Sequence, residues 1–98
     1  MPGFQKYTEL DVWKQARELV SHVYELAASY LKSEQFGLIS QIRKCVVSVP
    51  SNIAEGCLEA AYKKMDFLSI ARGSLFKLET RLYISKDLSF ITNDQLMI

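Results

Sequence analysis

The stretch from about 61 to 87 constrains the fold most, because it carries apolar residues at a helical repeat and contains no proline. One stripe repeats every seven residues, the spacing of a helix that packs along its length: Ala61, Leu68, Leu75 and Leu82. A second apolar stripe lies about a quarter turn away: Tyr62, Phe76, Tyr83 and Phe90. A helix in a small monomeric bundle needs only one apolar stripe. We therefore expect this helix to contact a second partner, either a fourth helix or a neighbouring subunit.

Helices are also predicted on both sides of this stretch. From about 9 to 31, apolar side chains recur at steps of three and four residues and charged residues fill the opposite face. Thr8 is the expected N-cap of this helix. From 93 to 98 the sequence begins another helix, with Thr92 or Asn93 as its cap, and stops after little more than one turn. Since a helix that short does not hold alone in water, we expect a truncated fourth helix.

A helix interrupted by a proline is predicted from about 34 to 57, with Ser33 as its N-cap. Pro50 lies inside its helical period, where it removes an N–H and crowds the carbonyl four residues back. The chain must therefore either kink at Pro50 or end and restart there, with Ser51 or Asn52 able to cap a restarted helix. Of these two, we expect a kinked helix.

The composition agrees with an all-helical chain. Only four glycines and two prolines occur among 98 residues, too few for the turns of a sandwich or barrel of short strands. A chain of this length forms one domain. The prediction is a single all-α domain over 1–98, an antiparallel up-down helical bundle of three long helices plus the truncated fourth.

Charge and cysteine content restrict the classes of partner and the compartment. The formal net charge is +1, which gives no general attraction for nucleic acid or an anionic membrane. Cys45 and Cys57 lack the CxxC spacing, and no secretory segment precedes them, which indicates buried, reduced thiols in a cytoplasmic protein. No apolar run reaches the roughly 20 residues that span a bilayer.

A polar cluster is predicted beside the Pro50 kink and along the seven-residue stripe: Asn52, Glu55, Arg72 and Glu79. Arg43 could join it. One interpretation is an internal hydrogen-bonded network that fixes the register of the helices, because buried charges must be paired. The others are a small-molecule or catalytic site and a surface that binds a partner. Gly73, in the middle of a helix, suggests a close backbone approach at this point.

Other chemistry has little support in the sequence. His22 is the only histidine, and it lies on the polar face of its helix, so neither a metal site nor a nucleophile paired with histidine is expected. No glycine-rich loop could cradle a phosphate. The prediction is therefore a non-enzymatic protein without metal or cofactor. Two basic pairs are candidate nucleic-acid contacts: Arg43 with Lys44, and Lys63 with Lys64.

Several motifs, in chain order, resemble one known family. They are Asp11-Val12-Trp13-Lys14-Gln15-Ala16, Gln41-Ile42-Arg43, Val49-Pro50-Ser51-Asn52-Ile53-Ala54-Glu55-Gly56, Ala71-Arg72-Gly73-Ser74 and Leu78-Glu79-Thr80. The resemblance is to the four-helix-bundle proteins encoded by intervening sequences inside bacterial 23S ribosomal RNA genes, and it covers nearly the whole chain. A related group comprises the accessory proteins of diversity-generating retroelements, which bind a reverse transcriptase and nucleic acid.

The resemblance implies a homo-oligomer, most commonly a pentameric ring, formed here through the third long helix and the C-terminal segment. It also implies an assembly or adaptor protein with RNA or an RNA-processing protein as its partner. A protein-binding module for a reverse-transcriptase-like partner is the alternative, and a site at the polar cluster is another. The chain departs from the family at 57–61, where the family tends to be basic, and it lacks the strong positive charge of the retroelement proteins.

Overall fold

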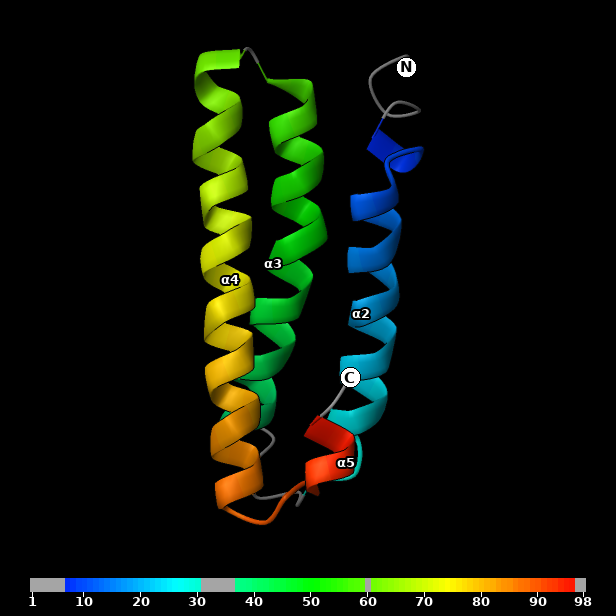
Figure 1. The fold of residues 1–98 in the computed structure, drawn as a ribbon, viewed down its shortest axis with the longest axis vertical. Helices are drawn as coiled ribbons and strands as arrows, with labels where there is room; N and C mark the ends of the chain where they lie inside the picture. Colours follow the sequence, from blue (N-terminus) through cyan, green and yellow to red (C-terminus); the bar gives the residue numbers. More distant parts are fainter. Residues whose placement is uncertain (1–6, 31–36, 60, 97–98) are drawn as a thin grey trace.

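The computed structural model describes residues 7–30, 37–59 and 61–96, with side chains described in the last segment from residue 63. Within these ranges the chain is all-α and contains no strand, as predicted. The elements are α2 (Asp11–Ala27), α3 (Leu38–Leu58), α4 (Ala61–Asp87) and the short α5 (Asn93–Leu96). The three long helices run alternately down, up and down (Figure 1).

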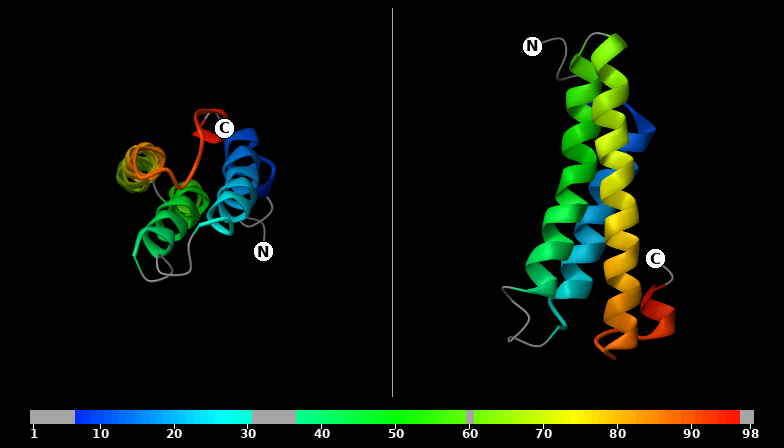
Figure 2. Two further views of the ribbon diagram at one scale, coloured as in Figure 1. Left: turned by 90° about the horizontal axis from the view of Figure 1, so that it is seen from below. Right: turned by 90° about the vertical axis from the view of Figure 1, so that its left-hand side faces the viewer.

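The long helices occupy three corners of a four-cornered bundle. α3 packs against both α4 and α2, whereas α2 and α4 are not packed against each other along their length. Seen end-on, α5 lies at the fourth corner, between α4 and α2 and opposite α3 (Figure 2). Because α5 is only one turn long, it fills this corner at one end of a molecule that is 43 Å long.

The first helix starts and ends inside its predicted bounds. The N-cap of α2 is Leu10, in extended conformation and without a side-chain hydrogen bond, so the prediction of Thr8 as the cap is wrong. Thr8 is itself helical, in a short turn that precedes a break at Leu10. At the other end, the Ser29 hydroxyl donates to the Leu26 carbonyl at 2.7 Å, where the helix gives way to a turn.

The proline in α3 does not divide the helix. α3 begins after Gly37, which has no side-chain cap bond, and continues through Pro50 to Leu58. The predicted cap Ser33 lies outside the described residues. Pro50 has no N–H with which to bond a carbonyl of the preceding turn. The side chains of the next two residues donate hydrogen bonds to other carbonyls of that turn. Ser51 Oγ donates to the Val47 carbonyl at 2.8 Å, and Asn52 Nδ2 donates to the Ser48 carbonyl at 2.8 Å. The alternative of a restarted helix is therefore wrong.

The core consists of two clusters on the inner faces of the helices. The larger one joins the lower halves of all three long helices with the turn after α4: Val23, Ala27, Tyr30, Ile39, Ile42, Val46, Leu78, Leu82 and Ile91. The smaller one holds Ala16, Val49, Ile53 and Ala71, with Trp13 packed against it. Among the residues whose side chains are described, the upper half therefore has fewer buried apolar residues than the base.

α4 approaches the backbone of α3 closely at Gly56, whereas the close approach predicted at Gly73 is not found. A Cβ at Gly56 would lie 3.3 Å from the Lys64 carbonyl oxygen and 3.4 Å from Phe67 Cβ. A Cβ at Gly73 would meet nothing within 4 Å. Of these two glycines, only Gly56 uses the absence of a side chain for packing.

The substitution Gly73→Ala is expected to stabilise the protein. Alanine is favoured over glycine in a helix interior by about 1 kcal/mol, and here it meets no steric penalty. For a domain of this size the midpoint of thermal unfolding should rise by roughly 4–8 °C. Calorimetry checks this, with Gly56→Ala as the matched control, because its added methyl must displace neighbours. An equal rise in both variants would contradict the assignment of the close approach to Gly56.

Candidate functional site

Helix α4 carries many large apolar side chains that its neighbouring helices leave exposed to water. Five of these exposed residues follow one side of α4, and we call them the groove strip: Met65, Leu68, Leu75, Phe76 and Tyr83. About half a turn away, helical periodicity places a second exposed strip, the outer strip, on α4 and the turn after it: Ile70, Ile84 and Leu88. Neither strip is covered within the described part of the chain, and the two face different directions.

The buried face of α4 is a third line, between these strips. It comprises Ala71, Ser74, Leu78, Leu82 and Ser85. Leu82 is thus the one member of the predicted seven-residue stripe found buried, while Leu68 and Leu75 are exposed and the side chain of Ala61 is not described. The expected contact of α4 with a second partner stays a prediction, and Phe76 and Tyr83 of the second predicted stripe are exposed.

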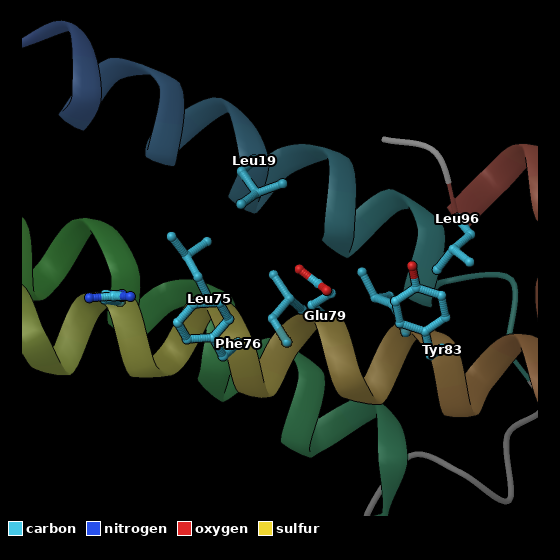
Figure 3. A pocket seen from close by; sticks show the side chains of 9 residues that line it. Leu19, Leu75, Phe76, Glu79, Tyr83 and Leu96 are labelled. Atoms are coloured by element: carbon cyan, nitrogen blue, oxygen red, sulfur yellow. The ribbon is translucent and has the colours of Figure 1, made fainter.

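An open groove of about 500 Å³ lies between α2 and α4, at the corner that α5 fills only at one end. We call it the α2–α4 groove. Leu19 of α2 forms one wall, Leu96 of α5 lies at its lower end, and α4 supplies the rest. The α4 residues are Arg72, Leu75, Phe76, Leu78, Glu79, Leu82 and Tyr83. Figure 3 shows Leu19 across from Leu75, with the Glu79 carboxylate between them and Tyr83.

Two opposite charges lie along this groove. Arg72 and Glu79 are both exposed and are seven residues apart, two helical turns on one side of α4. The guanidinium carbon of Arg72 lies 5.4 Å from the centre of the Phe76 ring, a cation–π contact on the groove strip. Each charge is therefore solvated in the single chain and available to a second body.

The predicted polar cluster is not a buried ionic network. Glu55, Arg72 and Glu79 are exposed, and Asn52 alone is half-buried. The prediction is wrong because Arg72 and Glu79 lie on the groove side of α4, away from the face that contacts α3. Chemistry that needs these four side chains together is not supported by this arrangement.

A small neutral network links α3 to α4 in its place. Asn52 Nδ2 donates to Ser48 Oγ at 2.9 Å, and Ser74 Oγ donates to the same Ser48 oxygen at 2.8 Å. The signal in the sequence was a serine on the apolar face of each helix. Buried hydroxyls of this kind need partners, and each helix supplies one for the other.

The candidate nucleic-acid contacts do not form a single patch. Lys44, Lys63 and Lys64 are exposed, but Arg43 is half-buried, with its guanidinium carbon 5.0 Å from the centre of the Tyr24 ring and its Nε enclosed. Arg43 therefore packs against α2 and does not extend toward a phosphate.

The two basic pairs lie at different heights on the bundle. Arg81, in the lower half of α4, donates to Gln41 and Cys45, which places the first pair at that level. Lys64 packs beside Gly56, near the upper end of α3. The separation is about 12 residues of helix, or roughly 18 Å.

The histidine and the cysteines do not come together in one site within the described residues. His22 is exposed, as predicted, and both cysteines are free and half-buried. Among the described residues, no three side chains of the metal-binding types come together. The same ranges include no helix whose length and apolar content would suit a membrane crossing.

Tyr30 gives the protein a dependence on alkaline pH. Burial raises its pKa above the ordinary 10.0, and the Ser85 hydroxyl lowers it in part. The neutral phenol therefore favours the folded state. This contribution is fully present below pH 10 and is lost as the pH rises through the raised pKa.

We expect the free energy of unfolding in urea to fall more steeply above pH 10 for the wild type than for Tyr30→Phe. The other titrating groups are common to both proteins and cancel in the difference. A constant difference between pH 8 and about pH 11 would contradict the assigned shift.

Comparison with known proteins gives one finding. A protein-family model described as 23S rRNA-intervening sequence protein matches residues 8–97. A search of the curated proteins finds no match to this chain. The family match spans all four described helices, so it covers both the groove and the two strips of α4.

Proposed function

Because the chain belongs to the 23S rRNA-intervening sequence protein family, we propose that it is a non-enzymatic, homo-oligomeric protein of the cytoplasm. Its role is that of an assembly or adaptor protein for RNA or an RNA-processing protein. The proposal rests on the two exposed apolar strips of α4, which no described part of the same chain covers. Exposed apolar surface rimmed by polar residues is typical of interaction sites, and Lys77 lies midway between Ile70 and Ile84 on the outer strip.

Self-association is assigned to the outer strip. Ile70, Ile84 and Leu88 are 50%, 42% and 56% exposed, on the side of α4 that faces away from the groove. A contact between this strip and a different patch on the next copy is heterologous, and it closes into a ring when the rotation allows. A ring of five is the form that the resemblance implies. Light scattering should then give about five times 11.2 kDa, and a monomer at micromolar concentration would contradict the assembly.

Association with RNA is assigned to the exposed lysines. One copy offers Lys44, Lys63 and Lys64, too few for strong binding at its net charge of +1. A ring repeats the same groups on every copy, so several weak contacts to one RNA act together. The binding should be weak per copy and strongly dependent on salt.

Replacing Lys44, Lys63 and Lys64 with glutamine is expected to weaken filter retention of a structured RNA at low salt. The logarithmic salt slope should fall in magnitude by roughly two to three for each copy that contacts the RNA, since three phosphate contacts are lost per copy. The control replaces Lys14, Arg17 and Lys86 with glutamine, which removes equal charge away from the outer strip. Equal losses in both variants, or no affinity in the wild type, would overturn the assignment.

A protein partner, such as a reverse-transcriptase-like enzyme, is the second candidate. The α2–α4 groove favours it, because an open apolar groove between two helices suits a helical segment of another protein.

A further inference from the structure

We propose that the outer side of α4 is covered, from Asp66 to Lys77, by the exposed face of α2 of a second copy, and that the two helices run parallel. The proposal rests on the self-association proposed above and names the surface that the neighbouring copy supplies. Three features carry it: the order of the charges along the two helices, a glycine between the charges of α4, and the heights of both surfaces in the bundle.

The surface on α4 is a line of four residues that includes Ile70 of the outer strip. We call it the α4 line, and its members recur at steps of four, three and four residues, the spacing of one helical face: Asp66, Ile70, Gly73 and Lys77. Gly73 is half-buried and the other three are exposed. Along the chain, the α4 line is acidic, apolar, small and basic.

The surface on α2 lies about half a turn from the buried residues Ala16 and Val23, so it faces away from the core. We call it the α2 line, and it has the same steps of four, three and four residues: Lys14, Glu18, Ser21 and Glu25. All four are exposed, whereas Gln15 lies outside the line, about a quarter turn from its centre. Along the chain, the α2 line is basic, acidic, small and acidic.

The charges at the ends of the two lines select the parallel direction. In the parallel register, Asp66 lies opposite Lys14 at one end. At the other end Lys77 lies opposite Glu25, so both ends carry opposite charges. Turning one line round sets lysine against lysine and carboxylate against carboxylate, which costs affinity. None of these four groups is in an ion pair with another described residue, so each charge is available to a second copy.

The middle of the α4 line lacks a side chain. Gly73 is not used for packing within the chain, because a Cβ there would meet nothing within 4 Å. In the parallel register it lies opposite Ser21, so two small residues meet where the helices pass and their backbones approach closely. Ile70, one turn above, then lies opposite the methylene groups of Glu18. A glycine that helix propensity alone disfavours thus acquires a packing role.

The heights of the two lines in the bundle agree with this register. Ala16 and Ala71 share the smaller core cluster, and Val23 and Leu78 share the larger one, so the level partners on α4 lie 55 positions further along the chain. The parallel register joins residues 52 positions apart, a difference of less than one helical turn.

A rotation about an axis parallel to the bundle leaves the direction and the height of each helix unchanged. Both α2 and α4 run downward, and they lie on either side of α3 (Figures 1 and 2). Copies related in this way therefore bring α4 of one beside a parallel α2 of the next, the head-to-tail contact of a closed ring.

The experiment measures the mass of the full chain by light scattering over a concentration series at low ionic strength. Lys77→Glu and Glu25→Lys should each raise the concentration of half-assembly at least about tenfold, because an attraction becomes a repulsion at every contact. The double variant Lys77→Glu/Glu25→Lys should restore the wild-type value. Arg72→Glu and Glu79→Lys, the matched controls on the groove side of α4, should retain it. Neutral glutamine, as in Lys14→Gln, is a weaker probe, since one exposed ion pair contributes little.

A further double variant, Lys77→Glu/Asp66→Lys, tests a competing arrangement in which α4 pairs antiparallel with α4 of the second copy. Rescue by this variant and not by Lys77→Glu/Glu25→Lys overturns the proposal. So does an assembled wild type whose mass is unchanged by both single reversals, which would reject the α2 line and leave the self-association intact. Failure of the proposed function gives a different result, a wild type that is a monomer at every concentration, and it overturns both.

Discussion

Replacing Ile42 with alanine is expected to lower the free energy of unfolding by about 2–5 kcal/mol, the largest effect of any single truncation considered. Ile42 is 0% exposed and lies in the larger core cluster, among residues of α2, α3 and α4. The loss combines the removed apolar contacts with the cavity that stays behind. Since small domains are stable by only about 5–15 kcal/mol, the midpoint of thermal unfolding should fall by 10 °C or more.

The matched control for this variant is Val47→Ala on the same helix. Val47 is 41% exposed and belongs to neither core cluster, so its truncation should change the stability by no more than about 0.5 kcal/mol. Urea unfolding followed by circular dichroism measures both variants. Equal destabilisation of the two would mean that the base of the bundle is not the main source of stability.

The second large effect is expected from Ile84→Lys, which should convert the proposed assembly into an 11.2 kDa monomer. Ile84 is at the surface of the single chain, so lysine there remains hydrated and the helix should fold. In the assembly, the same ammonium group would be buried among apolar side chains without a partner, at a cost of several kcal/mol per copy. Light scattering at micromolar concentration gives the mass, and circular dichroism verifies the helix content.

The control for this experiment carries the same gain of charge on the exposed face of α2, as Gln15→Lys. Its mass should equal that of the wild type. If Ile84→Lys kept the wild-type mass, the outer strip would not be the self-association surface. A loss of mass in both variants would point instead to a general effect of net charge.

Local sequence rules located the long helices well, but they misplaced the N-cap of the first helix. The repeat over 61–87 predicted the bounds of α4, because a long run of helical period has no rival structure. The caps were harder, since Thr8 is a good cap by residue type but lies in a separate turn before the break at Leu10. Pro50 does not end the helix, which runs from Leu38 to Leu58.

The family was also recognisable from the motifs, and the match over residues 8–97 confirms it. The polar cluster was not predictable in the same way. Spacing along one helix shows that Arg72 and Glu79 share a side of α4, but it does not show which side contacts α3. Two serines, Ser48 and Ser74, make the contact that the charged residues were expected to make.

The sequence by itself determined that the chain is helical, where its long helices lie and that α4 has more apolar surface than one neighbour covers. These are properties of local period and composition, which each segment carries alone. Only the tertiary structure decided how α4 is rotated about its own axis, and therefore which of its sides faces α3. The line through Ala71, Ser74 and Leu78 faces α3, where Ser74 donates to Ser48, and Leu75 is left along the groove. Helical period alone does not choose between these two sides, because each carries apolar residues at the same repeat.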